Sequence, residues 1–115
     1  MPERLTNSEF KEIYSKVPRA CVDVLVEMPT SEILLSRRAI EPEVGKWHAA
    51  GGTILKGETL KEAAKRVIRT EYGIEIDLEE IIGGVEYFHR DGRHDVITVI
   101  HAHYVSGDLI LNEQA

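Results

Sequence analysis

A carboxylate in line with an apolar helical stripe is the first residue whose placement points to chemistry. Residues 59–72 have helical periodicity, and at 100° per residue Leu60, Ala64, Val67 and Glu71 fall within one narrow arc. Burying a carboxylate there is costly, and the helix dipole disfavours negative charge in the last turn. Either an arginine or a bound cation compensates both penalties, or Glu71 lies just past the buried part of the stripe and is solvated.

The spacing of charged residues and glycines around Glu71 supports a functional role. Five residues separate Gly52 from Glu58, seven separate Glu58 from Arg66, and Glu71 follows. The motif G-x5-E-x7-R-E-U-x-E-E-x-G-U, with U aliphatic, is the Nudix box, and seven of its fixed positions over 23 residues are matched here. The matching residues are Gly52, Glu58, Arg66, Ile68, Glu71, Gly73 and Ile74. The chain therefore resembles the Nudix hydrolases.

Two glutamates of the box are replaced. Val67 stands where a glutamate follows the arginine, and Thr70 replaces the first of the paired glutamates. A helix with three carboxylates on one face can bind more than one Mg²⁺, whereas this helix offers Glu71 alone. We therefore expect no reaction that needs two or three metal ions.

The same two losses occur in one Nudix branch, the GDP-mannose mannosyl hydrolases, which this chain also resembles outside the box. The likeness runs almost without gaps from Asp23 to Ile76 and more loosely to the end. It includes Leu34-Leu35-Ser36-Arg37-Arg38, Pro42, Gly45, Trp47 and Gly51-Gly52.

The resemblance implies one Nudix domain over residues 1–115. Its α/β fold would be a mixed β-sheet sandwiched by helices, with an N-terminal helix over 1–17 that helps form a homodimer and the box over 52–74. Members of the branch continue past the position of Ala115 into another strand and a C-terminal helix. We therefore expect the fold without that helix.

The resemblance also implies a set of ligands. A single Mg²⁺ would be held by the Gly51 carbonyl, the Glu71 carboxylate and the Gln114 amide oxygen. Arg38 would contact the diphosphate, and Asp23 would lie in the substrate pocket. Since Arg37 and Arg38 alternate along a strand, at most one of them faces that pocket.

Two further roles follow from the resemblance. Glu58 and Arg66 would pair and hold the loop against the helix. The residue after the Gln114 position is a histidine that acts as general base in the branch, and here it is Ala115. Loss of a general base slows water attack by about 10²–10⁴-fold. The general base of this chain is thus unknown, with His89 as the first alternative.

The function implied is Mg²⁺-dependent hydrolysis of a nucleoside diphosphate sugar similar to GDP-mannose. Water would attack the anomeric carbon of the sugar and release the nucleoside diphosphate. One alternative is a Nudix pyrophosphohydrolase that cleaves at phosphorus, which the missing glutamates disfavour. The other is a non-catalytic nucleotide-binding module, which Ala115 and the missing carboxylates favour.

Composition limits the other classes of function. The chain has 115 residues with 14 basic and 20 acidic side chains, a net charge of −6 and no basic stripe, which argues against nucleic-acid binding. No apolar run approaches the roughly 18 residues of a membrane span. The lone Cys21 excludes a disulfide framework within the chain. A cytoplasmic protein is the default expectation.

Local signals predict the elements that position these residues. Capping boxes at Thr6/Glu9 and Thr59/Glu62 begin two helices, and Gly73 is a left-handed cap after the second. Alternation predicts strands over 20–27, 33–38, 81–89, 96–105 and 109–111, with a loop over 39–52 and a hairpin turn at 90–93.

Several other side chains have two possible roles. Arg90 and Arg93 could reach a phosphate or be solvated, and Trp47 could stack on a ligand or lie in the core. His101 and His103 could bind zinc or lie on the surface.

Overall fold

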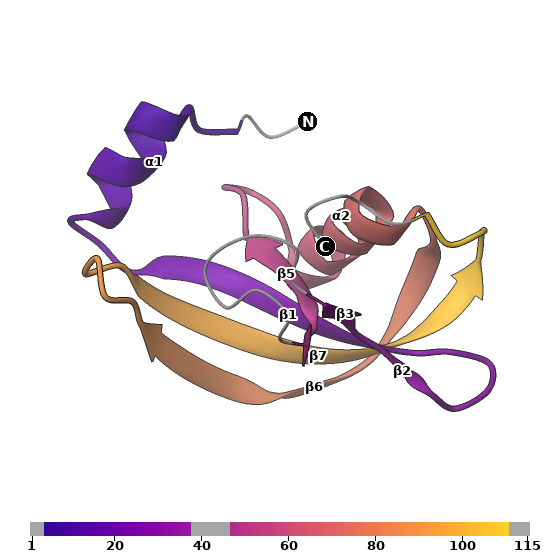
Figure 1. Cartoon of the computed structure of the whole chain (residues 1–115). Helices are drawn as coiled ribbons and strands as arrows, with labels where there is room; N and C mark the ends of the chain where they lie inside the picture. Colours follow the sequence, from indigo (N-terminus) through magenta and orange to yellow (C-terminus); the bar gives the residue numbers. More distant parts are fainter. Residues whose placement is uncertain (1–3, 38–46, 111–115) are drawn as a thin grey trace.

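The computed structural model describes residues 4–37 and 47–110, and its strands form a mixed sheet around β1 (Arg19–Glu27). Strand β1 runs parallel to β7 (His94–Ser106) on one side. On the other side it pairs antiparallel with β2 (Ile33–Leu34) and with β5 (Ala50–Thr53). The mixed α/β sheet predicted from the sequence is confirmed, and β1 lies at its centre (Figure 1).

The alternation of valines in β1 separates the two faces of the sheet. Val22, Val24 and Val26 are completely buried on the face toward helix α2 (Leu60–Tyr72), as the period of two in a strand requires. Asp23, between two of these valines, therefore points to the opposite face. It lies level with Gly51 in β5 and Val99 in β7.

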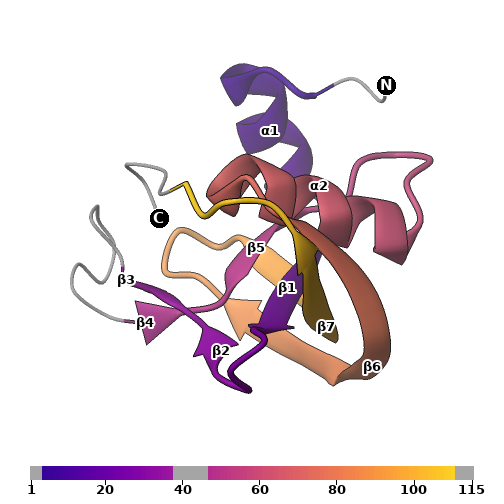
Figure 2. The ribbon, with the colours of Figure 1, turned by 90° about the vertical axis from the view of Figure 1, so that its right-hand side faces the viewer.

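Strands β6 (Glu75–Phe88) and β7 form a long antiparallel hairpin that curls beneath α2 (Figure 2). The predicted turn is present, because the His89 amide donates to the Arg93 carbonyl over 2.9 Å. Both strands are longer than predicted, and β6 starts six residues earlier. Three register shifts in β6 interrupt the alternation on which the prediction depended.

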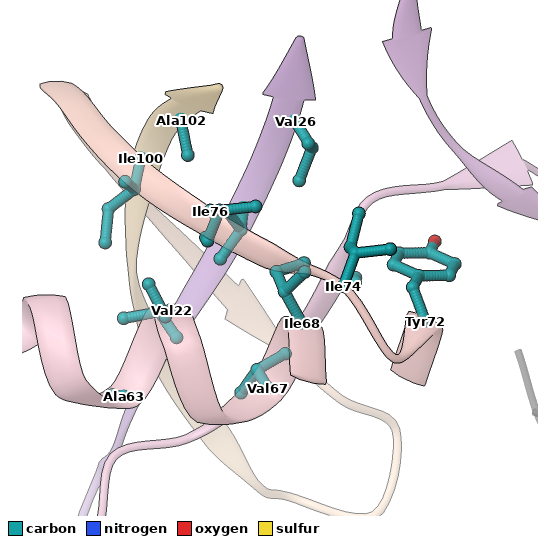
Figure 3. Packing of buried hydrophobic residues seen from close by; sticks show 13 residues of the cluster. Val22, Val26, Ala63, Val67, Ile68, Tyr72, Ile74, Ile76, Ile100 and Ala102 are labelled. Atoms are coloured by element: carbon teal, nitrogen blue, oxygen red, sulfur yellow. The ribbon is translucent and has the colours of Figure 1, made fainter. Parts of the chain in front are cut away.

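Helix α2 begins and ends at the predicted signals. Thr59 and Glu62 form the capping box, and Gly73 ends the helix with φ 71° while its amide donates to the Arg69 carbonyl. Its apolar face packs on the sheet to form the core (Figure 3). The buried helix residues are Ala63, Ala64, Val67, Ile68 and Tyr72.

Helix α1 (Asn7–Tyr14) stands off from the sheet at the end where β1 begins (Figure 1). The predicted capping box is present, with Thr6 Oγ accepting from the Glu9 amide over 3.2 Å. None of the helix residues is buried. Neither described helix has the length and hydropathy needed to cross a membrane.

Three predicted elements differ from the structure. Residues 33–37 form two short strands, β2 and β3 (Ser36–Arg37), and β3 leaves the main sheet to pair with β4 (Trp47–His48). The predicted loop over 39–52 contains β4 and most of β5, whose small residues show no alternation. No strand forms at Leu109 or Ile110; instead the Ile110 amide donates to the Tyr72 carbonyl over 2.7 Å.

Candidate active site

The glycine pair that precedes α2, Gly51-Gly52, lies in strand β5, which pairs with β1. The Ile54 amide donates to the Ala20 carbonyl over 2.9 Å, and this bond sets the phase of the antiparallel ladder. Because hydrogen-bonded and non-bonded pairs alternate, Gly51 and Asp23 form a non-bonded pair. The N–H and C=O of Gly51 therefore point away from β1, so neither group takes part in the ladder with that strand.

Asp23 crowds against Gly51 so closely that only glycine fits. A Cβ at position 51 would lie 2.1 Å from Asp23 Oδ1 and 2.7 Å from the Val22 carbonyl oxygen. Burial raises the pKa of Asp23, and the nearby His48 and Arg19 only partly offset that rise. The structure therefore places Asp23 against the strand carrying the glycine pair.

An ion pair fixes the loop between β5 and α2. Arg66 donates from Nε to Glu58 Oε2 over 2.7 Å and from Nη2 to the Thr53 carbonyl over 2.7 Å. Glu58 Oε1 accepts from the Leu55 amide over 2.8 Å. The hydrogen bond from Arg66 lowers the pKa of Glu58. The loop is thus anchored at both ends by one largely buried pair.

Glu71, in the last turn of the same helix, has one carboxylate oxygen without a described partner. The Oε2 atom is buried and has no hydrogen-bond partner in the part of the chain that the structure describes. Val67 and Thr70 lie beside it and offer no carboxylate. A buried carboxylate oxygen without a donor fits a cation, since such an oxygen is otherwise costly.

A cleft of about 610 Å³ joins these groups. Gly51, Gly52 and Glu71 line one wall, and Phe10 and Tyr14 of α1 line the other. Its volume is that of a small-molecule site. The lining of the cleft therefore includes both the Glu71 residue and the strand that carries Gly51.

A buried contact that the sequence did not indicate joins the end of α2 to the β3–β4 pair. The hydroxyls of Ser36 and Tyr72 are hydrogen-bonded, and both residues are buried. Tyr72 directly follows Glu71, and Ser36 comes two residues before Arg38. This bond links the helix with the proposed metal ligand to the strand that precedes the proposed diphosphate ligand. No sequence signal indicated it, because the contact depends on where the short strands lie.

A second buried charge cluster lies under α1. Asp95 accepts from Arg19 Nε and Nη2, each over 2.9 Å, and from His89 Nε2 over 2.7 Å. Burial alone would raise the pKa of Asp95, but the bonds from Arg19 and His89 hold it well below its ordinary value. The same His89 Nε2 lies 3.0 Å from Arg93 Nη2, so this nitrogen contacts both an acceptor and a donor. His89, the alternative general base, therefore lies in this charge cluster and is not among the residues that line the cleft.

The remaining sequence candidates are partly outside the described residues. Arg38, Gln114 and Ala115 lie outside them. Within the described ranges, no three histidine, cysteine or acidic side chains are placed to hold a metal ion. His101 instead pairs with Glu27 over 3.1 Å, and His103 with Glu79 over 2.5 Å. The structure also places Trp47 and Arg93, for which the sequence left two interpretations open. Trp47 is 65% exposed, and Arg93 pairs with Asp95 over 3.3 Å.

Comparison with known proteins assigns the family. The family model for the NUDIX domain matches residues 17–115. The chain belongs to the Nudix family. The predicted membership is confirmed, and the matched residues include the loop and helix over 52–74.

Two curated relatives of this Nudix chain differ in what their names say. The low-salt glycan biosynthesis protein Agl8 of Haloferax volcanii is 33% identical over 103 residues, which are 90% of this chain and 64% of the relative. An ADP-ribose pyrophosphatase of Methanocaldococcus jannaschii is 32% identical over 72% of this chain and 48% of the relative. The chain therefore spans less than two thirds of either curated relative.

Solved Nudix structures share the fold. The crystal structure of a MutT protein from Methanosarcina mazei has a TM-score of 0.71 and 28% identity, over 86% of this chain and 73% of that one. A UDP-X diphosphatase has a TM-score of 0.70 over 97% of this chain, and at 18% identity it supports the fold alone. The Nudix fold is thus shown by sequence and by structure.

Proposed function

We propose that this Nudix protein is a Mg²⁺-dependent hydrolase of a nucleoside diphosphate sugar similar to GDP-mannose. Water would attack the anomeric carbon, so the C–O bond to the diphosphate breaks and the nucleoside diphosphate leaves. The observation that carries the proposal is Glu71, the one carboxylate of α2 that lines the cleft, with an unused buried oxygen.

The residues of the cleft fit one hard cation. We propose that Glu71, the Gly51 carbonyl and Gln114 would supply the oxygen ligands that Mg²⁺ prefers, and the buried Glu71 Oε2 without a described partner supports this. A bound Mg²⁺ would neutralise charge developing on the departing diphosphate. Glu58 and Arg66 hold the loop that follows β5, so the carbonyl and the carboxylate keep a fixed relation.

Loss of two box glutamates favours attack at carbon. Activation of water at phosphorus uses two or more metal ions in many phosphoryl-transfer enzymes, and Val67 and Thr70 cannot hold them. Departure of a diphosphate from a sugar carbon needs charge neutralisation at the leaving group, which a single cation can supply. We propose that Arg38 shares this task and that Asp23, which is outside the lining of the cleft, acts through its contact with the Gly51 strand.

One relative supports a sugar substrate by its printed name. Agl8 of Haloferax volcanii is named as a glycan biosynthesis protein, which is consistent with chemistry on sugars. The ADP-ribose pyrophosphatase relative is named for cleavage within a diphosphate. That name supports the second candidate, cleavage at phosphorus, and the replaced glutamates count against it.

Hydrolysis of nucleotide sugars in ¹⁸O-labelled water distinguishes the candidates. Each sugar nucleotide is incubated with and without Mg²⁺, and the products are analysed by mass spectrometry. The proposal predicts label in the sugar and none in phosphate. Label in phosphate would replace it with the pyrophosphohydrolase, and tight binding without turnover would replace it with the binding module.

A further inference from the structure

Helix α1 presents an apolar side to the cleft instead of to the core. Phe10, Ile13 and Tyr14 recur at helical spacing and line the cleft, yet none is buried. Leu5, just before the helix, lines it as well. This side of α1 therefore contributes little to the core and is available to a ligand that occupies the cleft.

The position of α1 is set by contacts with the sheet, next to the glycine strand. The Phe10 ring lies against the guanidinium groups of Arg19 and Arg93, with centroid distances of 5.5 and 5.7 Å. Arg19 also donates to Thr53 Oγ over 2.7 Å, and Thr53 ends β5. These contacts place the helix wall next to the strand that carries Gly51.

The loop opposite α1 adds a free cation. Lys56 lines the cleft and forms no ion pair with any residue in the described ranges, whereas Arg66 is already paired with Glu58. The lining of the cleft therefore combines the Glu71 side chain, an ammonium group without an ion pair in the described ranges, and an aromatic wall. A nucleotide has the matching parts: a metal-bound diphosphate and a planar base.

We propose that α1 forms the nucleobase subsite of the substrate, with Tyr14 and Ile13 against the base and Lys56 on the diphosphate. The inference rests on the proposed function and adds to it the location of the base. An aromatic side chain binds a base by its face and accepts any of them, so Tyr14 contributes affinity more than base selectivity.

Calorimetric titration with GDP, UDP and guanosine in the presence of Mg²⁺ tests the subsite. Tyr14→Ala should weaken binding of all three ligands by about tenfold. Tyr14→Phe should bind as the wild type does, because the ring is kept. Lys56→Gln should weaken GDP and UDP only. Tyr87→Ala and Lys11→Gln, which change exposed residues that do not line the cleft, are the matched controls.

The outcomes separate this inference from the proposed function. Wild-type affinity for GDP in Tyr14→Ala would overturn the nucleobase subsite and leave the hydrolase standing. An oligomer that dissociates in Tyr14→Ala, with nucleotide affinity unchanged, would assign the α1 face to a second copy and overturn it too. A wild-type protein that binds no nucleotide would contradict both.

Discussion

The two walls of the cleft are built differently. The β5–α2 wall holds its charges in buried pairs and its backbone in close contact, as at Glu58–Arg66 and Asp23–Gly51. The α1 wall has no buried residue and rests on the ring of Phe10. The rigid wall carries the groups proposed to bind metal, which need fixed geometry. The lightly attached wall faces the part of a substrate that differs between nucleotides.

Breaking the ion pair of the rigid wall should have the largest effect. Arg66→Met leaves Glu58 buried without its partner and should lower the free energy of unfolding by about 3–5 kcal/mol. Arg69→Met removes the exposed pair with Glu75 and should cost less than about 1 kcal/mol. Urea denaturation measures both. Equal losses would show that the Glu58–Arg66 pair does not anchor the loop.

Adding a methyl group at Gly51 should have the second-largest effect on stability. Gly51→Ala places a methyl group against the Asp23 carboxylate and the Val22 carbonyl, so we expect a loss of about 1–3 kcal/mol. Gly52→Ala meets only Val67 Cγ2 at 3.2 Å and should cost less. Thermal unfolding of the two variants compares them. A more damaging Gly52→Ala would contradict the strand register described above.

The pH dependence of stability tests the contribution of two buried acids, Glu58 and Asp95. The pKa values of Glu58 and Asp95 are lower in the folded chain than their ordinary values. Their stabilisation is therefore complete above the ordinary pKa values, about 4, and is lost as pH falls through the folded values. Denaturation from pH 6 to pH 3 should show a loss of about 1–3 kcal/mol. Asp95→Asn should reduce that slope, and an unchanged slope would exclude Asp95 as a source.

Weakening the contacts between α1 and the sheet should have the smallest effect on stability. Phe10→Ala removes two cation–π contacts, and we expect a change of about 0.5–1 kcal/mol in the free energy of unfolding. Phe88→Ala, at a 70% exposed ring on β6, is the control. Global destabilisation comparable to that of Arg66→Met would show that α1 belongs to the core.

Local signals predicted the parts of the fold that depend on neighbours in sequence. Thr59, Glu62 and Gly73 fixed α2 because capping acts within one turn of a helix. The β3–β4 pair and β5 were missed, since strands of two to four small or polar residues have no period and depend on partners distant in sequence.

In the candidate site, too, local sequence predicts some residues, while the contacts of others depend on tertiary packing. Glu71 was predictable from its place on the helix and its spacing from Arg66 and Glu58. The contact of Asp23 with Gly51 follows from the register between β1 and β5, which sequence spacing does not contain. The Ser36–Tyr72 bond likewise depends on tertiary packing.

Metal binding at Glu71 is the central claim, and a titration with Mn²⁺ followed by electron paramagnetic resonance tests it most directly. The account predicts one bound ion per chain in the wild type, displaced by Mg²⁺, and no specific binding in Glu71→Gln. The variant should stay folded, because it removes a negative charge from the C-terminal end of a helix. One ion bound equally well by folded Glu71→Gln, or two ions in the wild type, would contradict the account.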